Sequence, residues 1–525
     1  MEKFFNTAGP ISNDLHYYVD SKKRWNFRRV TTLIAQQKYF VLHAPRQTGK
    51  TSALLALVDY LNATGKYEAV YANIETAQSA RENVPSAMKA IVGSIASSHR
   101  LFTKSNLLED NWLSIYNEVD ANNAILALLR FWAENTAKPT VLFLDEVDAL
   151  IGDTLISLLR QIRAGYNNRP TAFPISIVLC GVRDMRDYRI HSSRTKEIIT
   201  GGSAFNIKAE SLRLENFTKD HIQDLYGQHT AATGQVFEQG VIDLVWYYTE
   251  GQPWLVNALA YEATFNMSEN TDRSKVITKD TIQTAKERLI LRRDTHLDQL
   301  VDKLKEPRVQ RVIEPMLSGK VASADHRPDD VQYVRDLGLI NVAINGQIDI
   351  ANAIYKEVIP RELIWTMQTG MTTNHLWYIQ PNGSLDIFKL LESFQDFFRK
   401  HSEHWVEMYH YKEAAPQLLL QAYLQRIVNG GGRIEREYGF GRGRTDLFVE
   451  YFYGDGQKQE IVIELKILYN SIESTIEEGL QQIKNYMDKC GTQHGHLLIF
   501  DRRTNRSWEE KIWYKEVEGI HIWGC

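Results

Sequence analysis

The sequence has few cysteines, no strong charge imbalance and no long hydrophobic run. Its 525 residues include only three cysteines, Cys180, Cys490 and Cys525, whose spacing matches neither a metal site nor a disulfide framework and fits a reducing compartment. The formal net charge of −4 provides no global positive field, so any nucleic-acid surface must be local. No apolar run approaches the roughly 18 residues of a membrane span, and the N-terminus lacks the pattern of a secretory signal. We therefore expect a cytoplasmic protein without membrane contact.

The pattern along the chain indicates several domains. At the usual ~150 residues each, the length corresponds to about three domains. From about residue 27 to 215, helical patterns alternate with short apolar runs, which predicts an α/β fold with a parallel sheet covered on both faces. The runs are KYFVLHA, YEAVYANIE, TVLFLDEV and FPISIVLCG. Helical patterns continue to about residue 290, and the order helix, helix, β-hairpin over about 306–363 is typical of a winged helix.

A glycine-containing loop joins KYFVLHA to the helical segment SALLALVDYL. Its residues are Ala44, Pro45, Arg46, Gln47, Thr48, Gly49, Lys50 and Thr51. The loop resembles the Walker A pattern G-x-x-x-x-G-K-[ST], with Ala44 in place of the first glycine. Backbone N–H groups and the helix N-terminus would hold the phosphates of ATP, Lys50 would reach the β- and γ-phosphates, and Thr51 would hold Mg²⁺. We therefore predict that residues 45–51 bind ATP.

The apolar run TVLFLDEVDAL ends in two acidic residues and resembles a Walker B strand. Asp145 would support Mg²⁺, and Glu146 at the strand tip would orient or deprotonate the attacking water. The run ISIVLCG leads to Arg183, which a parallel sheet would bring to the same crevice. Arg183 or Arg186 is a candidate γ-phosphate sensor, in its own subunit or across the interface of a homo-oligomer, and a surface arginine is the alternative.

Several segments together resemble the prokaryotic AAA-like ATPases in or near the STAND signal-transduction group. They are NTAGPI…HYYV, APRQTGKT, FLDEVDAL, GVRDMRDYRI, SAFNIKAESLRLENFT and TEGQPWLVNALA, and the resemblance covers about residues 4–360. It implies an ATPase core, a helical lid and a winged helix, with ATP acting as a slowly hydrolysed switch. It also implies that the lid turn Gly251-Gln252-Pro253 packs toward the nucleotide.

A second candidate site lies in the stretch TDLFVEYFYGDGQKQEIVIELK. Its short polar loop predicts a β-hairpin folded about Asp455 and Gly456, which brings Asp446 opposite Leu465 or Lys466. Alternation along the strand places Lys466 on the same face as the glutamate two residues before it.

Asp446, Glu464 and Lys466 then converge at one end of the hairpin. Two neighbouring carboxylates repel each other unless a cation joins them, and their oxygens suit Mg²⁺ or Mn²⁺. A metal there would polarise a phosphodiester, while Lys466 would position the water or stabilise developing charge. The alternative is an ion pair on an edge strand.

The arrangement D-x(n)-E-x-K resembles the PD-(D/E)XK nuclease fold over about residues 410–505, although Thr445 replaces the proline of the family name. A helix with an early acidic residue precedes the hairpin, an arginine stands two residues before the aspartate, and the next helix carries the Q-x-x-x-Y pattern of the RecB-like branch. The resemblance implies metal ligands at Asp446, Glu464 and Glu413. It implies further site residues at Arg444, Gln482 and Tyr486.

These observations predict a chain of five segments. They are an ATPase core at 1–215, a lid at 216–300, a winged helix at 301–365, a linker at 366–384 and a nuclease-like domain at 385–525. The expected function is ATP-regulated, metal-dependent cleavage of nucleic acid, with DNA favoured over RNA, and by resemblance a role in antiviral defence or mobile-element control. The alternative is a STAND-like ATPase sensor whose C-terminal domain binds nucleic acid or protein without cutting.

Overall fold

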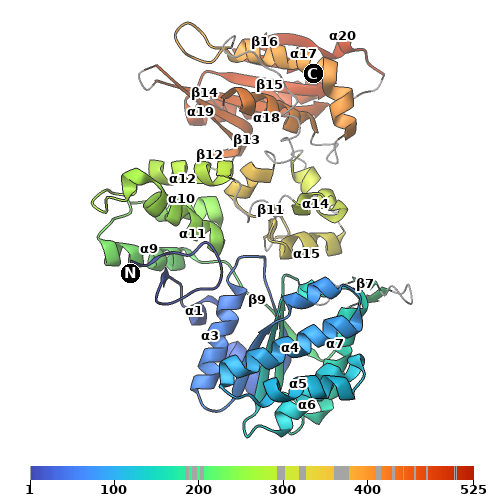
Figure 1. Cartoon of the computed structure of the whole chain (residues 1–525). Helices are drawn as coiled ribbons and strands as arrows, with labels where there is room; N and C mark the ends of the chain where they lie inside the picture. Colours follow the sequence, from blue (N-terminus) through green and yellow to red (C-terminus); the bar gives the residue numbers. More distant parts are fainter. Residues whose placement is uncertain are drawn as a thin grey trace. The chain divides into compact units, whose positions relative to one another are not determined.

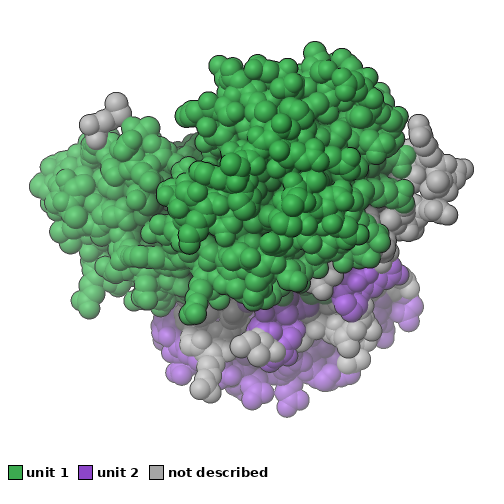
Figure 2. All heavy atoms as spheres, turned by 90° about the horizontal axis from the view of Figure 1, so that it is seen from below, with its two compact units in different colours: residues 1–296, 331–340 green, residues 297–330, 341–525 purple. Residues whose placement is uncertain are grey.

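In the computed structural model (Figure 1), the chain forms two compact units, which Figure 2 shows in different colours. The first unit comprises residues 1–296 and 331–340, and the second comprises residues 297–330 and 341–525. The residues that the structure describes are 2–183, 189–191, 198–200, 206–292, 302–317, 327–343, 345–359, 378–408, 415–428, 432–440, 443–454, 457–468, 471–501, 503 and 505–525.

A five-stranded parallel sheet forms the centre of the first unit, in the order β4-β5-β6-β3-β9. Its strands are β3 (Tyr39–His43), β4 (Glu68–Asn73), β5 (Thr140–Asp145), β6 (Ser176–Gly181) and β9 (Lys208–Arg213). The four apolar runs of the sequence become β3 to β6, so the predicted parallel sheet is confirmed. The sequence does not predict β9, because this edge strand is only partly buried and its residues, KAESLR, form no apolar run. A short antiparallel pair, β7 (Arg189–His191) and β8 (Ile198–Thr200), follows β6.

Helices cover both faces of this sheet (Figure 1). Successive strand residues point to opposite faces, so Tyr39 and Val41 join one core while Phe40 and Leu42 join the other. The first core includes α4 (Val84–Thr103), α5 (Leu107–Glu118), α6 (Ala124–Glu134) and α7 (Gly152–Gly165), and the second includes α2 (Phe27–Ala35) and α3 (Lys50–Ala63). Burial on both faces explains why the strands are continuous apolar runs rather than alternating ones.

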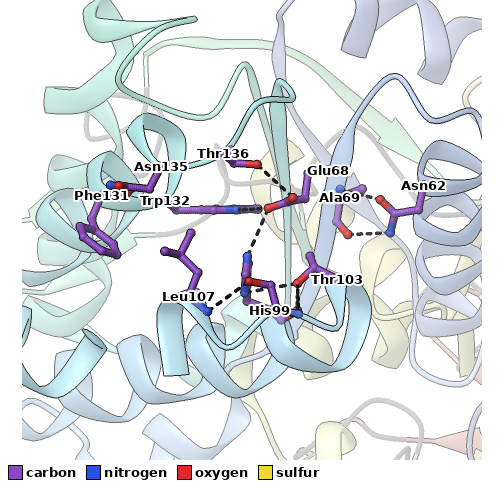
Figure 3. A network of polar contacts seen from close by, with 11 residues as sticks. Asn62, Glu68, Ala69, His99, Thr103, Leu107, Phe131, Trp132, Asn135 and Thr136 are labelled. Carbon is purple, nitrogen blue, oxygen red and sulfur yellow. Dashed lines mark hydrogen bonds and ion pairs between the residues drawn. The ribbon is translucent and has the colours of Figure 1, made fainter. Parts of the chain in front are cut away.

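A polar network attaches α4 and α6 to the start of β4 (Figure 3). The Glu68 carboxylate accepts hydrogen bonds from Trp132 Nε1 at 2.6 Å and Thr136 Oγ1 at 3.0 Å, and it lies 3.2 Å from His99 Nε2. Burial alone would raise the pKa of Glu68, but the hydrogen bonds from His99, Trp132 and Thr136 outweigh it and lower that pKa. The network therefore fixes the helices at the end of the sheet remote from the phosphate loop.

Four helices follow the sheet, at the predicted position of the lid. They are α9 (Lys219–Thr233), α10 (Val241–Thr249), α11 (Pro253–Tyr261) and α12 (Lys279–Arg292). The N-terminal strands β1 (Phe4–Phe5) and β2 (His16–Tyr17) pack against them, and Trp254 Nε1 donates to the Thr7 carbonyl at 2.8 Å. The same N-terminal segment reaches α3, because the Ile11 N–H donates to Ser52 Oγ at 3.0 Å. This segment thus joins the lid helices to the helix that follows the phosphate loop.

The next elements appear in the order helix, helix, hairpin, as predicted. They are α14 (Pro307–Leu317), α15 (Pro328–Asp336), β10 (Ile340–Val342) and β11 (Ile348–Ile350). Asn345 and Gly346 lie between the two strands, and Gly346 has a positive φ of 82°. Of the predicted linker, residues 366–377 lie outside the described part of the chain.

The second unit contains a six-stranded sheet in the order β12-β13-β14-β15-β17-β16. Its strands are β12 (Gly432–Phe440), β13 (Gly443–Tyr453), β14 (Gln457–Leu468), β15 (Gly495–Asp501), β16 (Trp513–Val517) and β17 (Ile520–Gly524). The first three are antiparallel neighbours, and β15 pairs in parallel with β14 after the crossover helix α19 (Ile472–Cys490).

Helices also cover this second sheet. On one face, α19 packs against Phe448, Val462 and Leu497. The Phe398 ring of α17 (Ile387–Met408) lies 5.3 Å from Phe500, whose place along β15 puts it on the opposite face. The helix α18 (Ala415–Val428) packs on α17. In the described residues, no helix combines the length and the apolar character needed to cross a membrane.

The register of the β13–β14 hairpin differs from the prediction. Leu447 pairs with Ile463 and Tyr453 pairs with Gln457. If this register continues by one residue beyond Leu447 and Ile463, Asp446 falls opposite Glu464 rather than opposite Leu465 or Lys466. The physical reason is that β14 already begins at Gln457, so the connection between the two strands is shorter than the polar loop assumed from the sequence.

Candidate functional site

The phosphate loop leaves β3 and ends at the first turn of α3. Gly49 caps the helix with φ +85°, a left-handed conformation that favours glycine. Inside the loop, Thr48 Oγ1 donates to the Pro45 carbonyl at 2.8 Å, and Lys50 Nζ donates to the Ala44 and Pro45 carbonyls at 3.0 Å each. The unpaired N–H groups of the helix start and the Lys50 ammonium therefore concentrate positive charge at one point, as an anion site requires. All predicted residues from Pro45 to Thr51 belong to this loop, with Arg46 and Gln47 exposed.

Thr51 and Asp145 meet at the end of the sheet. Thr51 Oγ1 donates to Asp145 Oδ2 at 2.7 Å, which joins the two sequence motifs in one site. A third residue, Tyr71 of β4, donates its hydroxyl to the same oxygen at 3.0 Å. Burial, together with the Asp145 charge, raises the pKa of Tyr71, so the phenol keeps its proton and stays a donor. No motif predicts Tyr71. The available signal is that YEAVYANIE forms the strand beside TVLFLDEV.

Glu146 occupies a strained turn beyond β5. Its backbone is left-handed, with φ 60° and ψ 39°, a conformation uncommon for a residue with a Cβ. Burial raises the pKa of the Glu146 carboxyl, and the negative charges of Asp145 and Asp148 add to this effect. A carboxylate whose proton affinity is raised is a better general base at neutral pH than an ordinary glutamate.

Arg183 lies at the end of β6, as predicted, but its guanidinium is engaged. Its Nε is 3.9 Å from Asp148 Oδ1, and its guanidinium lies 5.4 Å from the centre of the Tyr333 ring. Asp148 also accepts a hydrogen bond from the Val182 N–H. The sequence reasoning missed Asp148, which follows Glu146 by two residues and connects the tips of β5 and β6.

The segment 331–340 also contacts this edge of the sheet, within the first unit. The buried carboxylate of Asp336 lies 3.9 Å from His43 Nδ1, at the end of β3. A Cβ added to Gly338 would come within 2.7 Å of the Pro45 ring, so the segment touches the phosphate loop itself. The sequence predicts a winged helix here but gives no sign of this contact.

In the C-terminal domain, Glu464 and Lys466 share one face of β14. Lys466 Nζ is 3.6 Å from Glu464 Oε1, and it donates to Glu478 Oε1 of α19 at 3.0 Å. Glu464 is buried, with 4% of its surface exposed, whereas Glu478 is exposed. The predicted pair is therefore present, and Glu478 is a partner that the sequence reasoning missed. Helix and strand spacing alone could not align Glu478 with Lys466, because the crossover loop sets that alignment.

Gln482 and Tyr486 lie on the same side of α19 as Glu478. Tyr486 packs against Val462 and Phe448, so α19 runs antiparallel to β14. Four helical residues advance about 6 Å and two strand residues about 6.6 Å, so the row Glu478, Gln482, Tyr486 matches the strand row Lys466, Glu464, Val462. Gln482 is thus level with Glu464, and its Oε1 is buried without a hydrogen-bond donor among the described residues.

Three predicted nuclease residues are described only in part or not at all. Asp446 and Arg444 lie on β13, with their side chains outside the described part, and Glu413 lies outside it entirely. The antiparallel register, continued by one residue beyond the pair Leu447 and Ile463, would place Asp446 across from Glu464, where opposite residues share one face of a sheet. Among the side chains that the structure does describe, no group of three or more His, Cys, Asp or Glu residues is arranged to hold a metal ion.

Comparison with known proteins gives two family matches that divide the chain. The family described as AAA-like domain matches residues 6–358. A domain of unknown function (DUF8371) matches residues 386–504. No curated protein matches the chain.

Solved structures resemble the chain at low sequence identity. The Walker-type ATPase paby2304 of Pyrococcus abyssi is 12% identical, with 68% of this chain and 99% of that chain covered and a TM-score of 0.47. Cdc6p from Pyrobaculum aerophilum is 15% identical, with 64% and 94% covered and a TM-score of 0.36. The RuvB Holliday junction branch migration motor of Thermotoga maritima is 12% identical, with 64% and 94% covered and a TM-score of 0.33.

Proposed function

The chain belongs to the AAA-like domain family, and we propose that it is a P-loop ATPase whose nucleotide state regulates a metal-dependent nuclease domain. The ATPase half rests on the family and on the contact between Thr51 and Asp145. The nuclease half rests on one observation, the alignment of Glu464, Lys466 and Gln482 on a single face between β14 and α19.

At the nucleotide site, the proposed roles follow from the geometry. The loop N–H groups and Lys50 bind the β- and γ-phosphates. Thr51 and Asp145 supply adjacent oxygen atoms, a donor set that fits Mg²⁺, which when bound neutralises phosphate charge. Glu146 orients the attacking water and accepts its proton. Arg183 stabilises the γ-phosphate after release from Asp148.

At the C-terminal site, Asp446 and Glu464 would hold Mg²⁺ or Mn²⁺, with Glu413 as a further ligand. Their carboxylate oxygens fit either ion, which when bound supplies a Lewis acid for a phosphodiester. Lys466 neutralises the charge that develops on the phosphate. Gln482 fixes the position of substrate or water through its buried amide oxygen, and Arg444 and Tyr486 are further candidates for substrate contact.

The test uses the full chain with supercoiled DNA, linear DNA and a matched RNA, in Mg²⁺ or Mn²⁺, with and without ATP. Glu464→Gln removes the charge with little change of shape, and we expect cleavage to fall by at least about 100-fold while ATP hydrolysis is retained. Glu460→Gln is the matched control, because Glu460 lies on the same strand but pairs with Lys458. Lys50→Ala should abolish ATP hydrolysis and alter cleavage.

Two outcomes would contradict this proposal in different ways. Absence of cleavage under every condition, with ATP still hydrolysed, would refute the nuclease and favour a regulator that binds without cutting. The ion pairs of Lys466 with Glu464 and Glu478 are the observation that supports this second function, since both could be purely structural. Cleavage that is unchanged in Lys50→Ala would refute regulation by ATP but leave the nuclease intact.

A further inference from the structure

A buried arginine outside every recognised motif contacts the phosphate loop. Arg24 ends the short helix α1 (Ser21–Arg24), and only 9% of its surface is exposed. Its Nη1 donates to the Thr48 carbonyl at 2.7 Å, and its Nη2 donates to the Glu215 carbonyl at 2.8 Å. One guanidinium therefore joins the phosphate loop to the strand that leads into the lid.

The surroundings of Arg24 are unusual for a charged side chain. Burial lowers the pKa of Arg24 to about 10, and no carboxylate in the described part of the chain offsets the effect, so the group remains a cation at neutral pH among carbonyl oxygens. Burying a charge without a counter-ion is unfavourable, and an apolar side chain would fill the same space without that cost. The charge therefore has a use beyond packing.

That use follows from the geometry of the peptide bond. A trans peptide is planar, so its C=O and N–H point in opposite directions. The carbonyl of Thr48 and the N–H of Gly49 belong to one peptide, and Arg24 holds the carbonyl. Among the described residues the Gly49 N–H has no acceptor, as expected for a donor reserved for a phosphate.

We propose that Arg24 is a positioning residue, which aims the Gly49 N–H at the nucleotide phosphates by fixing the Thr48–Gly49 peptide. A cation on the carbonyl also polarises the peptide and strengthens its N–H as a donor. Arg24 acts on the phosphates through the loop and need not touch them.

The glycine in this position supports the assignment. A Cβ at Gly49 would lie 2.8 Å from Arg24 Nη1, so the guanidinium occupies the space that a side chain would need. The left-handed φ of +85° favours glycine independently. Glycine here serves both the loop conformation and the close approach of Arg24.

The other side of the guanidinium is anchored to the lid. Arg24 lies 4.8 Å from the centre of the Phe217 ring, and the Phe217 N–H donates to the Gly251 carbonyl at 2.8 Å. A Cβ at Gly251 would lie 2.0 Å from the Phe217 carbonyl oxygen, so these backbones are in tight contact. Arg24 therefore connects the loop peptide, through Phe217, to the tightly packed turn before α11.

The test compares Arg24→Met with Lys23→Met. Both lose one positive charge from α1, but Lys23 is exposed and forms an ion pair with Asp224 at 3.6 Å. Binding of Mg·ADP and of inorganic pyrophosphate is measured by calorimetry, because pyrophosphate probes the phosphate cradle without the adenosine. We expect Arg24→Met to lower the affinity for both ligands by a similar factor of about 10. This is the effect expected when one charge-assisted hydrogen bond is lost. Lys23→Met should bind both as the wild type does.

A second variant decides the matter if Arg24→Met does not fold. Arg24→Lys keeps the charge but not the two-pronged geometry, and we expect pyrophosphate to bind at least about threefold more weakly. Wild-type pyrophosphate affinity in the folded variant would overturn the proposal. Loss of ADP binding alone would also overturn it, because that result assigns Arg24 to the lid or the adenosine pocket.

Discussion

In the nucleotide site, eight consecutive residues from Ala44 to Thr51 form the phosphate loop, whereas the C-terminal cluster draws Glu464 and Lys466 from a strand and Gln482 from the next helix. Short-range hydrogen bonds from Thr48 and Lys50 to carbonyls three to six residues away stabilise the loop, and Arg24 adds one contact from outside it. The cluster is held by strand register and by the packing of α19. A contiguous site is thus specified locally, while a dispersed site depends on the whole domain.

The two sites also differ in how their charges are balanced. At the nucleotide site, burial and neighbouring acids raise the pKa of Glu146, and Nη1 and Nη2 of the Arg24 cation donate to backbone carbonyls. In the C-terminal cluster, Lys466 is shared between Glu464 and Glu478. In the nucleotide site, the Arg24 cation therefore lies near the expected phosphates without a carboxylate partner among the described residues. If the cluster cleaves nucleic acid as proposed, Lys466 must first leave at least one of its two carboxylate partners.

The largest expected effect tests whether the contiguous site is really independent of distant residues. Gly338→Ala would force a left-handed residue at φ +80°, which costs about 1–2 kcal/mol, and crowd the Pro45 ring, which costs about 1–3 kcal/mol more. We expect a lower melting temperature for the ATPase part and a higher KM for ATP, because Pro45 belongs to the phosphate loop. Calorimetry and phosphate release measure the two effects.

Gly346→Ala is the matched control, because Gly346 has φ +82° with nothing within 4 Å of an added Cβ. It should show only the backbone cost of about 1–2 kcal/mol and an unchanged KM. Equal changes in KM for both variants would mean that the segment 331–340 does not support the loop.

The same contrast explains what the sequence could predict. The strands β3 to β6, the phosphate loop and the pairing of Thr51 with Asp145 follow from local patterns, because a parallel sheet brings all its strand ends together. The partnership of Lys466 with Glu478 and the register at Asp446 do not, since a single residue in a hairpin loop shifts every pairing. The sequence does not predict the roles of Arg24 and Tyr71, because these roles arise from contacts between residues far apart in the chain. Such contacts give no motif with a fixed spacing.

A moderate effect is expected where the dispersed site depends on helix packing. A Cβ at Gly479 would lie 2.6 and 2.7 Å from the two δ-carbons of Leu497, so Gly479→Ala should displace α19 from β15. Crowding costs about 1–3 kcal/mol, and the better helix propensity of alanine returns up to about 1 kcal/mol. We expect the C-terminal domain to melt at a lower temperature and cleavage to decline while ATP hydrolysis is unchanged.

Gly227→Ala is the control for a helical glycine without crowding, because this glycine of α9 has nothing within 4 Å of an added Cβ. It should stabilise the first unit by about 0.5–1 kcal/mol. Gly479→Ala could lower the melting temperature and yet cleave at the wild-type rate. That result would mean that cleavage does not depend on the packing of α19, and it would weaken the nuclease proposal.

The smallest expected effect compares the acid sensitivity of the two units. Hydrogen bonds lower the pKa of Glu68 in the first unit and of Asp501 in the second, in each case against the opposing effect of burial. A carboxyl whose pKa is lower in the folded state stabilises the fold above its ordinary pKa, which is 4.5 for Glu68 and 3.8 for Asp501, and this stabilisation is lost as the pH falls through the lower folded value. Glu68→Gln should therefore reduce the stability of the first unit at neutral pH and flatten its acid limb below pH 4.5, leaving the second unit unaltered.

Asp501→Asn should reduce the stability of the second unit at neutral pH and leave the first unit unaltered. The change should be smaller, because its partner Arg503 is partly exposed and solvent screens the pair. Melting curves of the full chain between pH 3 and 7 would resolve the two transitions. If both substitutions shifted both transitions equally, the units would unfold together, and the division into a locally specified and a globally specified site would have no counterpart in stability.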